Sequence, residues 1–251
     1  WIMRNETAAA LTLTQGSGAN VAIAAGQTKI VATDGAGSGA IVYEMDDLEL
    51  AGNLIVAGTV AADMTFADGA DIITASAGTS NFRAGVNAGN SIESGGNHNV
   101  AVGDEAGTAI STGDGNIVIG FEAGHDITTG GYNTFIGWKS GDKLIDSNNN
   151  VAIGDASLSA DTKGSKSVAV GSNALNAQNF TSATDSLNTA VGFSAGLAIT
   201  TGVQNTFIGG LAGDALTTSN NNLAIGYKAL SADTVGTKTT AIGFEALMSQ
   251  N

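Results

Sequence analysis

The side chains in this sequence that could carry chemistry are two histidines, scattered carboxylates and several regularly placed aromatic rings. His98 and His125 are the only histidines and lie 27 residues apart. A histidine-centred catalytic or metal site needs carboxylates or a nucleophile at a defined geometry, which the sequence around either residue does not indicate. We therefore expect both histidines to lie on the surface.

Carboxylates are plentiful, and they include Asp104, Glu105, Glu122, Asp155 and Glu245. Two such groups about 5–10 Å apart can cleave a glycosidic bond, so a polysaccharide-cleaving tailspike is one alternative. The acids nevertheless follow no pattern that singles out a pair. The chain has no cysteine, which excludes disulfides, thiolate catalysis and cysteine-based metal sites. We predict no enzyme activity, no cofactor and no metal site.

Five aromatic residues directly follow regularly spaced glycines: Phe121, Trp138, Phe193, Tyr227 and Phe244. Exposed rings in a column can stack on sugar rings, which makes these residues the candidate receptor contacts. Like residues at equivalent positions also pack on one another as structural ladders. The sequence leaves both interpretations open.

Two polar rows have simpler explanations. Paired threonines at 128–129, 200–201 and 217–218 do not recur at every repeat, which argues against a flat ice-binding face. We expect the regularly spaced asparagines to be stacked amides that bond to one another and to turn backbone. They are Asn99, Asn116, Asn133, Asn150, Asn188, Asn205 and Asn222.

These side chains belong to a repeat that occupies residues 81–251. Each copy reads as Asn, three mostly apolar residues, Gly, two variable residues, Ala or Ser, then Gly or Leu. Most central glycines are 17 residues apart, which indicates a stacked, quasi-one-dimensional architecture. A longer step near residues 178–185 predicts an insertion that bulges from one face. The central glycines are Gly85, Gly103, Gly120, Gly137, Gly154, Gly171, Gly192, Gly209, Gly226 and Gly243.

Each repeat contains one short strand, because a run of β-prone residues ends at the central glycine. Copies stacked in parallel about 4.8 Å apart form a rod roughly 45–50 Å long. Two coil types share one core position. Where the fourth residue after the central glycine is Gly, the seventh is Ile or Leu; where the fourth is Leu, the seventh is polar. Each coil thus supplies one large aliphatic side chain.

The strands are apolar, or nearly so, on both faces, so they need cover on both sides. We expect the middle residue of each strand to pack against another chain around an axis, as in a tight cyclic oligomer. These residues are Ala101, Val118, Phe135, Ala152, Ala169, Ala190, Phe207, Ala224 and Ala241.

The segments Asn150–Gly154, Ser167–Gly171 and Thr240–Leu247 resemble the head repeats of trimeric autotransporter adhesins. Variants such as Asn205–Gly209 resemble repeats of bacteriophage tail-fibre proteins. The resemblance covers about two thirds of the chain. It implies a left-handed parallel β-roll with three chains around one axis. Two settings remain: a virion tail fibre, or the head of an adhesin on the bacterial outer surface.

Residues 1–80 favour the fibre. Residues 1–47 contain strand-like runs at 11–14, 21–24, 29–33 and 40–43, which predict a small β domain. Residues 48–80 begin with short alternating strands whose glycines are six apart, similar to the intertwined β shafts of phage fibres.

Charge and hydropathy limit the partners. A net charge of −14 disfavours nucleic acid and anionic membrane surfaces, and no apolar run is long enough for membrane insertion. We expect an all-β homotrimeric fibre segment of an extracellular virion. It contacts other tail proteins and a glycan or protein receptor on the host surface.

Overall fold

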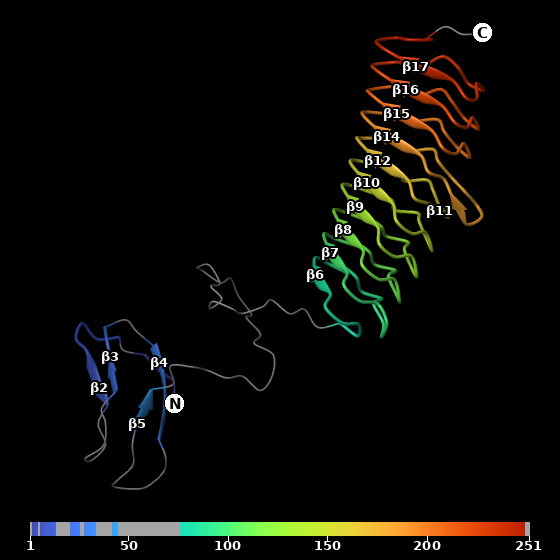
Figure 1. The fold of residues 1–251 in the computed structure, drawn as a ribbon. Coiled ribbons are helices and arrows are strands. Elements are labelled where there is room, and N and C mark those ends of the chain that lie inside the picture. Colours follow the sequence, from blue (N-terminus) through green and yellow to red (C-terminus); the bar gives the residue numbers. More distant parts are fainter. Residues whose placement is uncertain are drawn as a thin grey trace. The chain divides into compact units, whose positions relative to one another are not determined.

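The computed structural model describes residues 2–4, 6–13, 21–25, 28–33, 42–44 and 76–248. These residues form strands and turns, with no helix among them, so the all-β prediction is confirmed. The chain divides into two compact units, Trp1–Ala67 and Asp68–Asn251 (Figure 1).

The first unit contains two small antiparallel sheets. Strands β1 (Ile2–Arg4), β4 (Thr28–Thr33) and β5 (Val42–Glu44) pair in the order β1-β4-β5, and β2 (Leu11–Leu13) pairs with β3 (Val21–Ile23). The strands expected in this region are therefore present. Of the predicted shaft at 48–80, only residues 76–80 fall within the described residues, and they form no strand.

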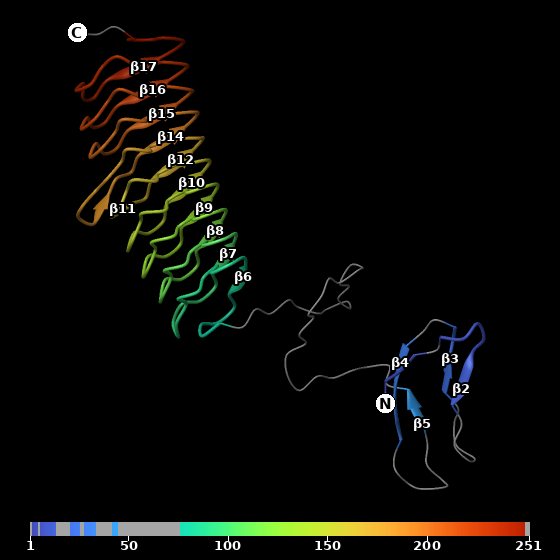
Figure 2. The ribbon, with the colours of Figure 1, turned by 180° about the vertical axis from the view of Figure 1, so that it is seen from behind.

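The second unit is a β-solenoid in which ten three-residue strands stack into one parallel sheet (Figures 1 and 2). The register follows the repeat, since Val151 pairs with Val168 and Ile153 with Val170. The predicted roll of 17-residue coils is thus confirmed. Its strands are β6 (Phe82–Ala84), β7 (Val100–Val102), β8 (Ile117–Ile119), β9 (Thr134–Ile136), β10 (Val151–Ile153), β12 (Val168–Val170), β14 (Thr189–Val191), β15 (Thr206–Ile208), β16 (Leu223–Ile225) and β17 (Thr240–Ile242).

Residues with positive φ turn the chain around each coil. In the coil centred on Gly137, Tyr132, Gly137, Lys139 and Gly141 have φ values of 59°, 136°, 52° and 56°. Only the central position requires glycine for both conformation and space. A Cβ on Gly137 would lie 2.5 Å from the carbonyl oxygen of Gly154 in the next coil. The spacing between coils therefore depends on this glycine.

The middle residue of each solenoid strand points into the interior of its own chain. Arg83 in the first coil is half-buried, and its Nε donates to the carbonyl oxygen of Ala88 at 2.7 Å. Ala101, Val118, Phe135, Ala152 and the equivalent residues of later coils are 0–1% exposed within the single chain. The prediction that this column packs against a second chain is therefore wrong. A three-residue strand places its middle side chain on the face opposite its two neighbours, and here the coil wraps around the middle one.

One large aliphatic side chain per coil fills the interior, as predicted. Ile110 is buried in a coil with glycine at the fourth position, and Leu158 is buried in a coil with leucine there. A Cβ on Gly107 would lie 2.6 Å from Ile110 Cδ1, so the isoleucine occupies the space beside the fourth position. Leu158 itself adopts φ 53°, an unfavourable conformation that burial of its side chain offsets.

The asparagine row is an interior ladder, which confirms its structural interpretation. Asn116 donates from its Nδ2 to Asn99 Oδ1 at 3.0 Å and to the carbonyl oxygen of Gly130 at 2.9 Å. Its backbone nitrogen donates to the same Asn99 Oδ1 at 2.9 Å. Each buried amide thus binds the coil before it and the turn that closes its own coil. A satisfied buried amide stabilises the stack by about 1 kcal/mol.

A glutamine bridges the ladder where serine replaces asparagine. Gln178 Nε2 donates to Ser167 Oγ at 2.9 Å and to Asp161 Oδ2 at 2.6 Å. Its Oε1 accepts from Asn188 Nδ2 at 2.8 Å. The polar residue at the seventh position of this coil therefore replaces the missing amide, a role that the sequence analysis did not foresee.

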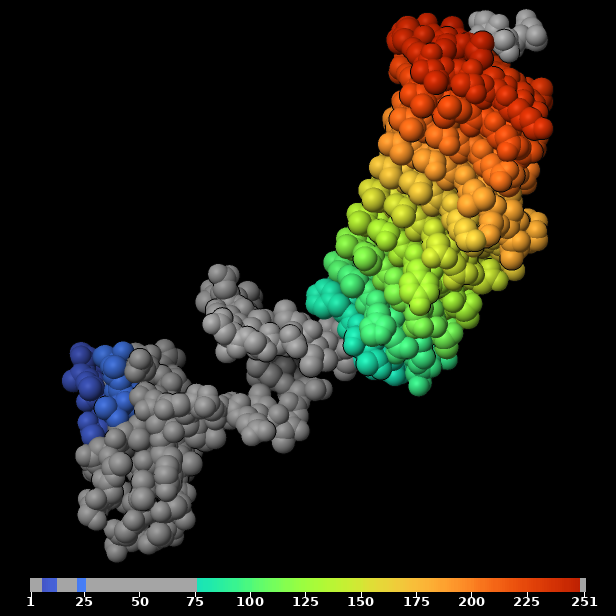
Figure 3. Space-filling view, viewed as in Figure 1, coloured from blue at the N-terminus to red at the C-terminus, as the bar shows by residue number. Residues whose placement is uncertain are grey.

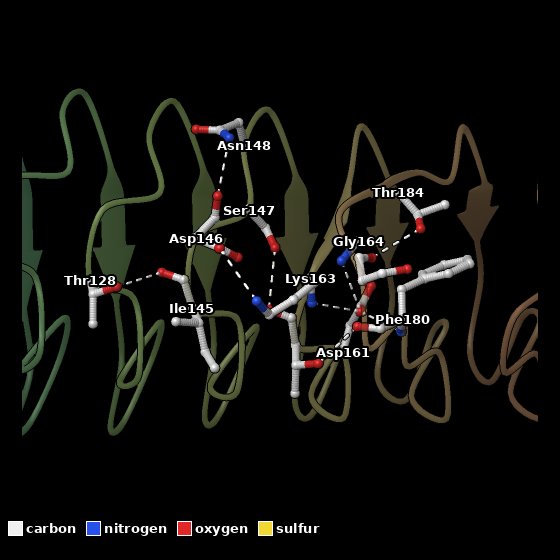
Figure 4. Close-up of polar contacts among 12 residues, drawn as sticks. Thr128, Ile145, Asp146, Ser147, Asn148, Asp161, Lys163, Gly164, Phe180 and Thr184 are labelled. Carbon is white, nitrogen blue, oxygen red and sulfur yellow. Dashed lines mark hydrogen bonds and ion pairs between the residues drawn. The ribbon is translucent and has the colours of Figure 1, made fainter.

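The predicted insertion forms a small side sheet that projects from the solenoid (Figure 3). Strands β11 (Gly164–Ser165) and β13 (Thr184–Asp185) pair in parallel. Asp161 anchors the insertion because its Oδ1 accepts from the backbone nitrogens of Gly164 and Phe180, each at 3.0 Å (Figure 4). Phe180 is 6% exposed, so its ring holds the base of the projection against the coil.

Candidate interaction surface

The outer face of the ten-stranded sheet is apolar. In β10, Ala152 is buried, whereas Val151 is half-buried and Ile153 is 36% exposed. The first and third residues of the other strands lie on the same outer face, and most of them are Val, Ile or Thr. Stacking in register aligns these residues in two columns that run the length of the sheet.

The exposed large hydrophobic side chains of residues 76–248 gather on this face and beside it. Only Ile145 and Val235 lie elsewhere; the others are Phe82, Val86, Ile117, Phe121, Tyr132, Trp138, Ile153, Leu187, Val191, Phe193, Ile208, Tyr227, Ile242 and Phe244. Ten strands about 4.8 Å apart, each with its flanking residues about 20 Å across, give a surface on the order of 900 Å². This footprint includes polar border residues such as Lys139, Asn149 and Glu245, so its apolar part is smaller.

One border of the face, here named the exit margin, consists of the first and second residues after each central glycine. It holds the five predicted aromatic residues, all of which are 41–72% exposed. Phe121 and Trp138 stack with ring centroids 6.3 Å apart, and Tyr227 and Phe244 stack at 5.6 Å. Phe193 has no aromatic ring beside it in either adjacent coil, because the equivalent residues there are Ser172 and Gly210. The aromatic column is therefore two pairs and one separate ring.

Two lysines on the exit margin lie over aromatic rings. Lys139 Nζ is 4.9 Å from the centroid of Trp138, and Lys228 Nζ is 5.5 Å from that of Tyr227. Lys139 also forms an ion pair with Glu122 at 3.0 Å. Each contact of this kind at an exposed site contributes up to about 1 kcal/mol.

The opposite border, here named the entry margin, was not recognised from the sequence. It consists of the residue that precedes the asparagine position of each coil. All of its non-glycine members have φ values near 60°, and Tyr132 and Leu187 are 69% and 48% exposed. The only feature of the sequence that could have identified the entry margin is that its residues occupy one fixed position of the repeat. The entry margin comprises Ser80, His98, Gly115, Tyr132, Asn149, Lys166, Leu187, Gln204, Asn221 and Lys238.

The histidines lie apart. His98 is exposed on the entry margin. His125 Nδ1 lies 2.6 Å from Asp126 Oδ1, and its Nε2 lies 3.8 Å from Glu105 Oε2. Within the described residues, no group of three or more His, Cys, Asp or Glu side chains could hold a metal ion.

The sequence-selected carboxylates lie in several coils of the solenoid. Asp104 Oδ1 accepts the backbone nitrogen of Val86 at 3.1 Å, and Glu122 pairs with Lys139. Asp155 and Glu245 lie on the exit margin, five coils apart. Asp104 therefore caps a turn and Glu122 forms an ion pair, with Asp104, Glu105 and Glu122 on two adjacent coils.

Two aspartates at equivalent positions of their coils have raised pKa values. Burial raises the pKa of Asp142, although nearby Lys143 and Lys139 oppose the shift. Burial likewise raises the pKa of Asp214, although a backbone hydrogen bond and Lys228 oppose the shift. Burial lowers the pKa of Lys143, but Asp126 and Asp142 outweigh that effect and leave it raised. Oδ1 of both aspartates has no hydrogen-bond partner within the described residues.

The threonine pairs contribute to stacking. Thr128 Oγ1 donates to the carbonyl oxygen of Ile145, and Thr200 Oγ1 donates to that of Thr217, each at 3.2 Å. Thr217 continues the row to Thr234 at the same distance. These hydroxyls bind the next coil, as the contact from Thr128 in Figure 4 illustrates.

Comparison with protein-family models, with curated proteins and with solved structures finds no match to this chain. In the part of the chain that the structure describes, no helix is long and apolar enough to cross a membrane.

Proposed function

We propose that this chain is a structural component of a virion tail fibre that attaches to the host, and that it assembles as a homotrimer. The observation that carries this proposal is the apolar outer face, which extends along a rod of similar coils. A rod supplies length and repeats its lateral surface at every layer. Those properties suit a fibre that holds an adhesive end away from a particle.

The area and the symmetry of the face favour self-association. About 900 Å² is close to the roughly 800 Å² that each partner contributes to a stable interface. Rotation about an axis parallel to the rod brings equivalent coils of each copy to the same height, so all ten layers are covered together. The number three rests on the resemblance of the repeats to trimeric heads and fibres.

Three copies per fibre would present three equivalent contacts to a host surface. Several weak contacts with a glycan or protein receptor then act together, and avidity exceeds the affinity of each. The chain would work outside the cell, joined to other tail proteins of the virion.

The native mass of the full 251-residue chain tests the assembly. We expect a trimer, and we expect Val191→Glu on the outer face to give monomers or a concentration-dependent mixture. Ile145→Glu is the matched control, because Ile145 and Val191 are equally exposed at 37% but Ile145 lies away from the face. A wild-type chain that is monomeric at micromolar concentration would overturn the proposal.

Attachment is tested with the trimer and the Val191→Glu variant on bacterial surface polysaccharides and on whole cells. We expect the trimer to be retained more strongly than the variant and to release no reducing sugar ends. Release of such ends would contradict a purely adhesive role. Equal retention of the two proteins would contradict avidity.

A further inference from the structure

We infer that the two margins of the outer face recognise each other between neighbouring copies: the entry margin of one chain contacts the exit margin of the next, coil for coil. This inference rests on the proposed homotrimer and specifies how its copies meet. Three sheets that face one axis form a triangle in cross-section, and each corner joins one border of a sheet to the opposite border of its neighbour.

The geometry pairs residues of the same coil. A rotation parallel to the rod does not change the height of any residue. Along one chain, the two margins of a coil are six residues apart, so their heights differ by only about 1.7 Å of the 4.8 Å step between coils. An entry-margin residue therefore lies level with the exit-margin residues of the same coil in the adjacent copy.

Apolar residues meet apolar residues under this pairing. Leu187, 48% exposed, is level with Phe193, which is 60% exposed and has no stacked ring beside it in its own chain. Tyr132, 69% exposed, is level with Trp138, 51% exposed. The two largest apolar residues of the entry margin thus face aromatic rings. Burial of such rings between chains supplies area and preferred stacking geometry.

The charges are complementary in the same register. Lys238 is level with Glu245, and neither forms an ion pair within residues 76–248 of its own chain. His98 is level with Asp104 and Glu105. No coil brings two like charges together. The chain has a net charge of −14, so contacts between two copies would often bring acidic side chains together. The pairing of the two margins avoids such repulsion in every coil.

A displacement by one coil would lose these matches. With the preceding coil of the neighbour, Lys238 would face Lys228 and Leu187 would face Asn173. With the following coil, Leu187 would face Leu211 and Lys238 would have no partner. The in-register alignment is the one that pairs both Leu187 with Phe193 and Lys238 with Glu245, so the differences between layers favour it. In this arrangement the rings of the exit margin pack between subunits.

Disulfide trapping tests the pairing directly, because the natural chain has no cysteine. In the full-length Leu187→Cys/Phe193→Cys variant, we expect oxidation to give a covalent trimer on a non-reducing gel. In one chain the two positions lie beyond opposite ends of the extended strand β14, six residues apart, a span of up to about 20 Å. The Cα atoms of a disulfide lie only about 4.4–6.8 Å apart. A bond between them must therefore join two chains.

The matched control is Leu187→Cys/Phe121→Cys, whose positions lie four coils apart and should give no covalent trimer. A second pair, Tyr132→Cys/Trp138→Cys, provides an independent layer if the first variant misfolds. A trimer by native mass that forms no bond at either layer overturns the margin pairing but leaves the proposed function intact. A monomeric wild-type chain overturns both.

Charge exchange gives a third readout. We expect Lys238→Glu alone to weaken the trimer at low salt, and we expect the added change Glu245→Lys to restore it. A double variant that is no better than the single variant would contradict the pairing at this layer.

Discussion

Replacement of one central glycine by alanine adds only a methyl group but should strongly destabilise the solenoid. Gly154 has φ 132°, and a Cβ there would lie 2.6 Å from the carbonyl carbon and 2.7 Å from the carbonyl oxygen of Gly171. The conformation alone costs about 1–3 kcal/mol for a residue with a side chain. The contact is with backbone, so relief requires the two coils to separate.

We expect Gly154→Ala to cost at least about 3 kcal/mol, which corresponds to a fall in Tm of roughly 6–12 °C for a unit of this size. The assay is thermal unfolding followed by far-ultraviolet circular dichroism at fixed protein concentration. Gly210→Ala is the control. A Cβ on Gly210 would lie 3.6 Å from the nearest atom, Cδ2 of Tyr227, and the φ of Gly210 is outside the left-handed region. That variant should unfold like the wild type. If both variants melt within about 2 °C of each other, the assigned role of the central glycine is wrong.

Two further predictions concern the interior and its charges. Leu230→Gly should destabilise the chain by about 2–4 kcal/mol because a buried leucine is lost. Asp233→Ile alone should also be destabilising, because Asp233 Oδ1 accepts from the backbone nitrogens of Val235 and Gly236. The double variant should be more stable than the sum of the two losses, since isoleucine fills the space of the leucine; simple additivity in thermal melts would contradict the shared slot. For Asp214, the folded pKa is raised, so the carboxyl favours folding at low pH and loses that contribution as pH rises through the folded pKa. Relative to wild type, Asp214→Asn should therefore gain Tm in circular-dichroism melts between about pH 3 and pH 7, and an unchanged difference would refute this.

Most of the solenoid could be predicted from the sequence because each coil fills its interior with the same residue types at the same positions of the repeat. The central glycine, the exchange between Ile110-type and Leu158-type coils and the asparagine ladder all have signatures at fixed positions. The bridge made by Gln178 has no such signature, since it arises once, where Ser167 interrupts the ladder.

The orientation of the strands was predicted incorrectly for a physical reason. Both faces are apolar, and Phe135 and Phe207 share a column that otherwise holds mostly alanine. The many alanines of that column suggested close packing of several chains around an axis. Small residues beside each ring, such as Gly141 and Gly213, make the interior space that the sequence pattern did not reveal: a Cβ on either would lie within 2.8 Å of the ring.

The asparagine ladder and the glycine contacts join each coil only to the coils immediately above and below. These contacts therefore do not fix the number of coils. Insertion or removal of one 17-residue repeat would change the length of the solenoid by about 4.8 Å, and the remaining coils would still make the same kinds of contact with adjacent coils. The length of the solenoid can therefore change in steps of one coil by duplication of a single repeat.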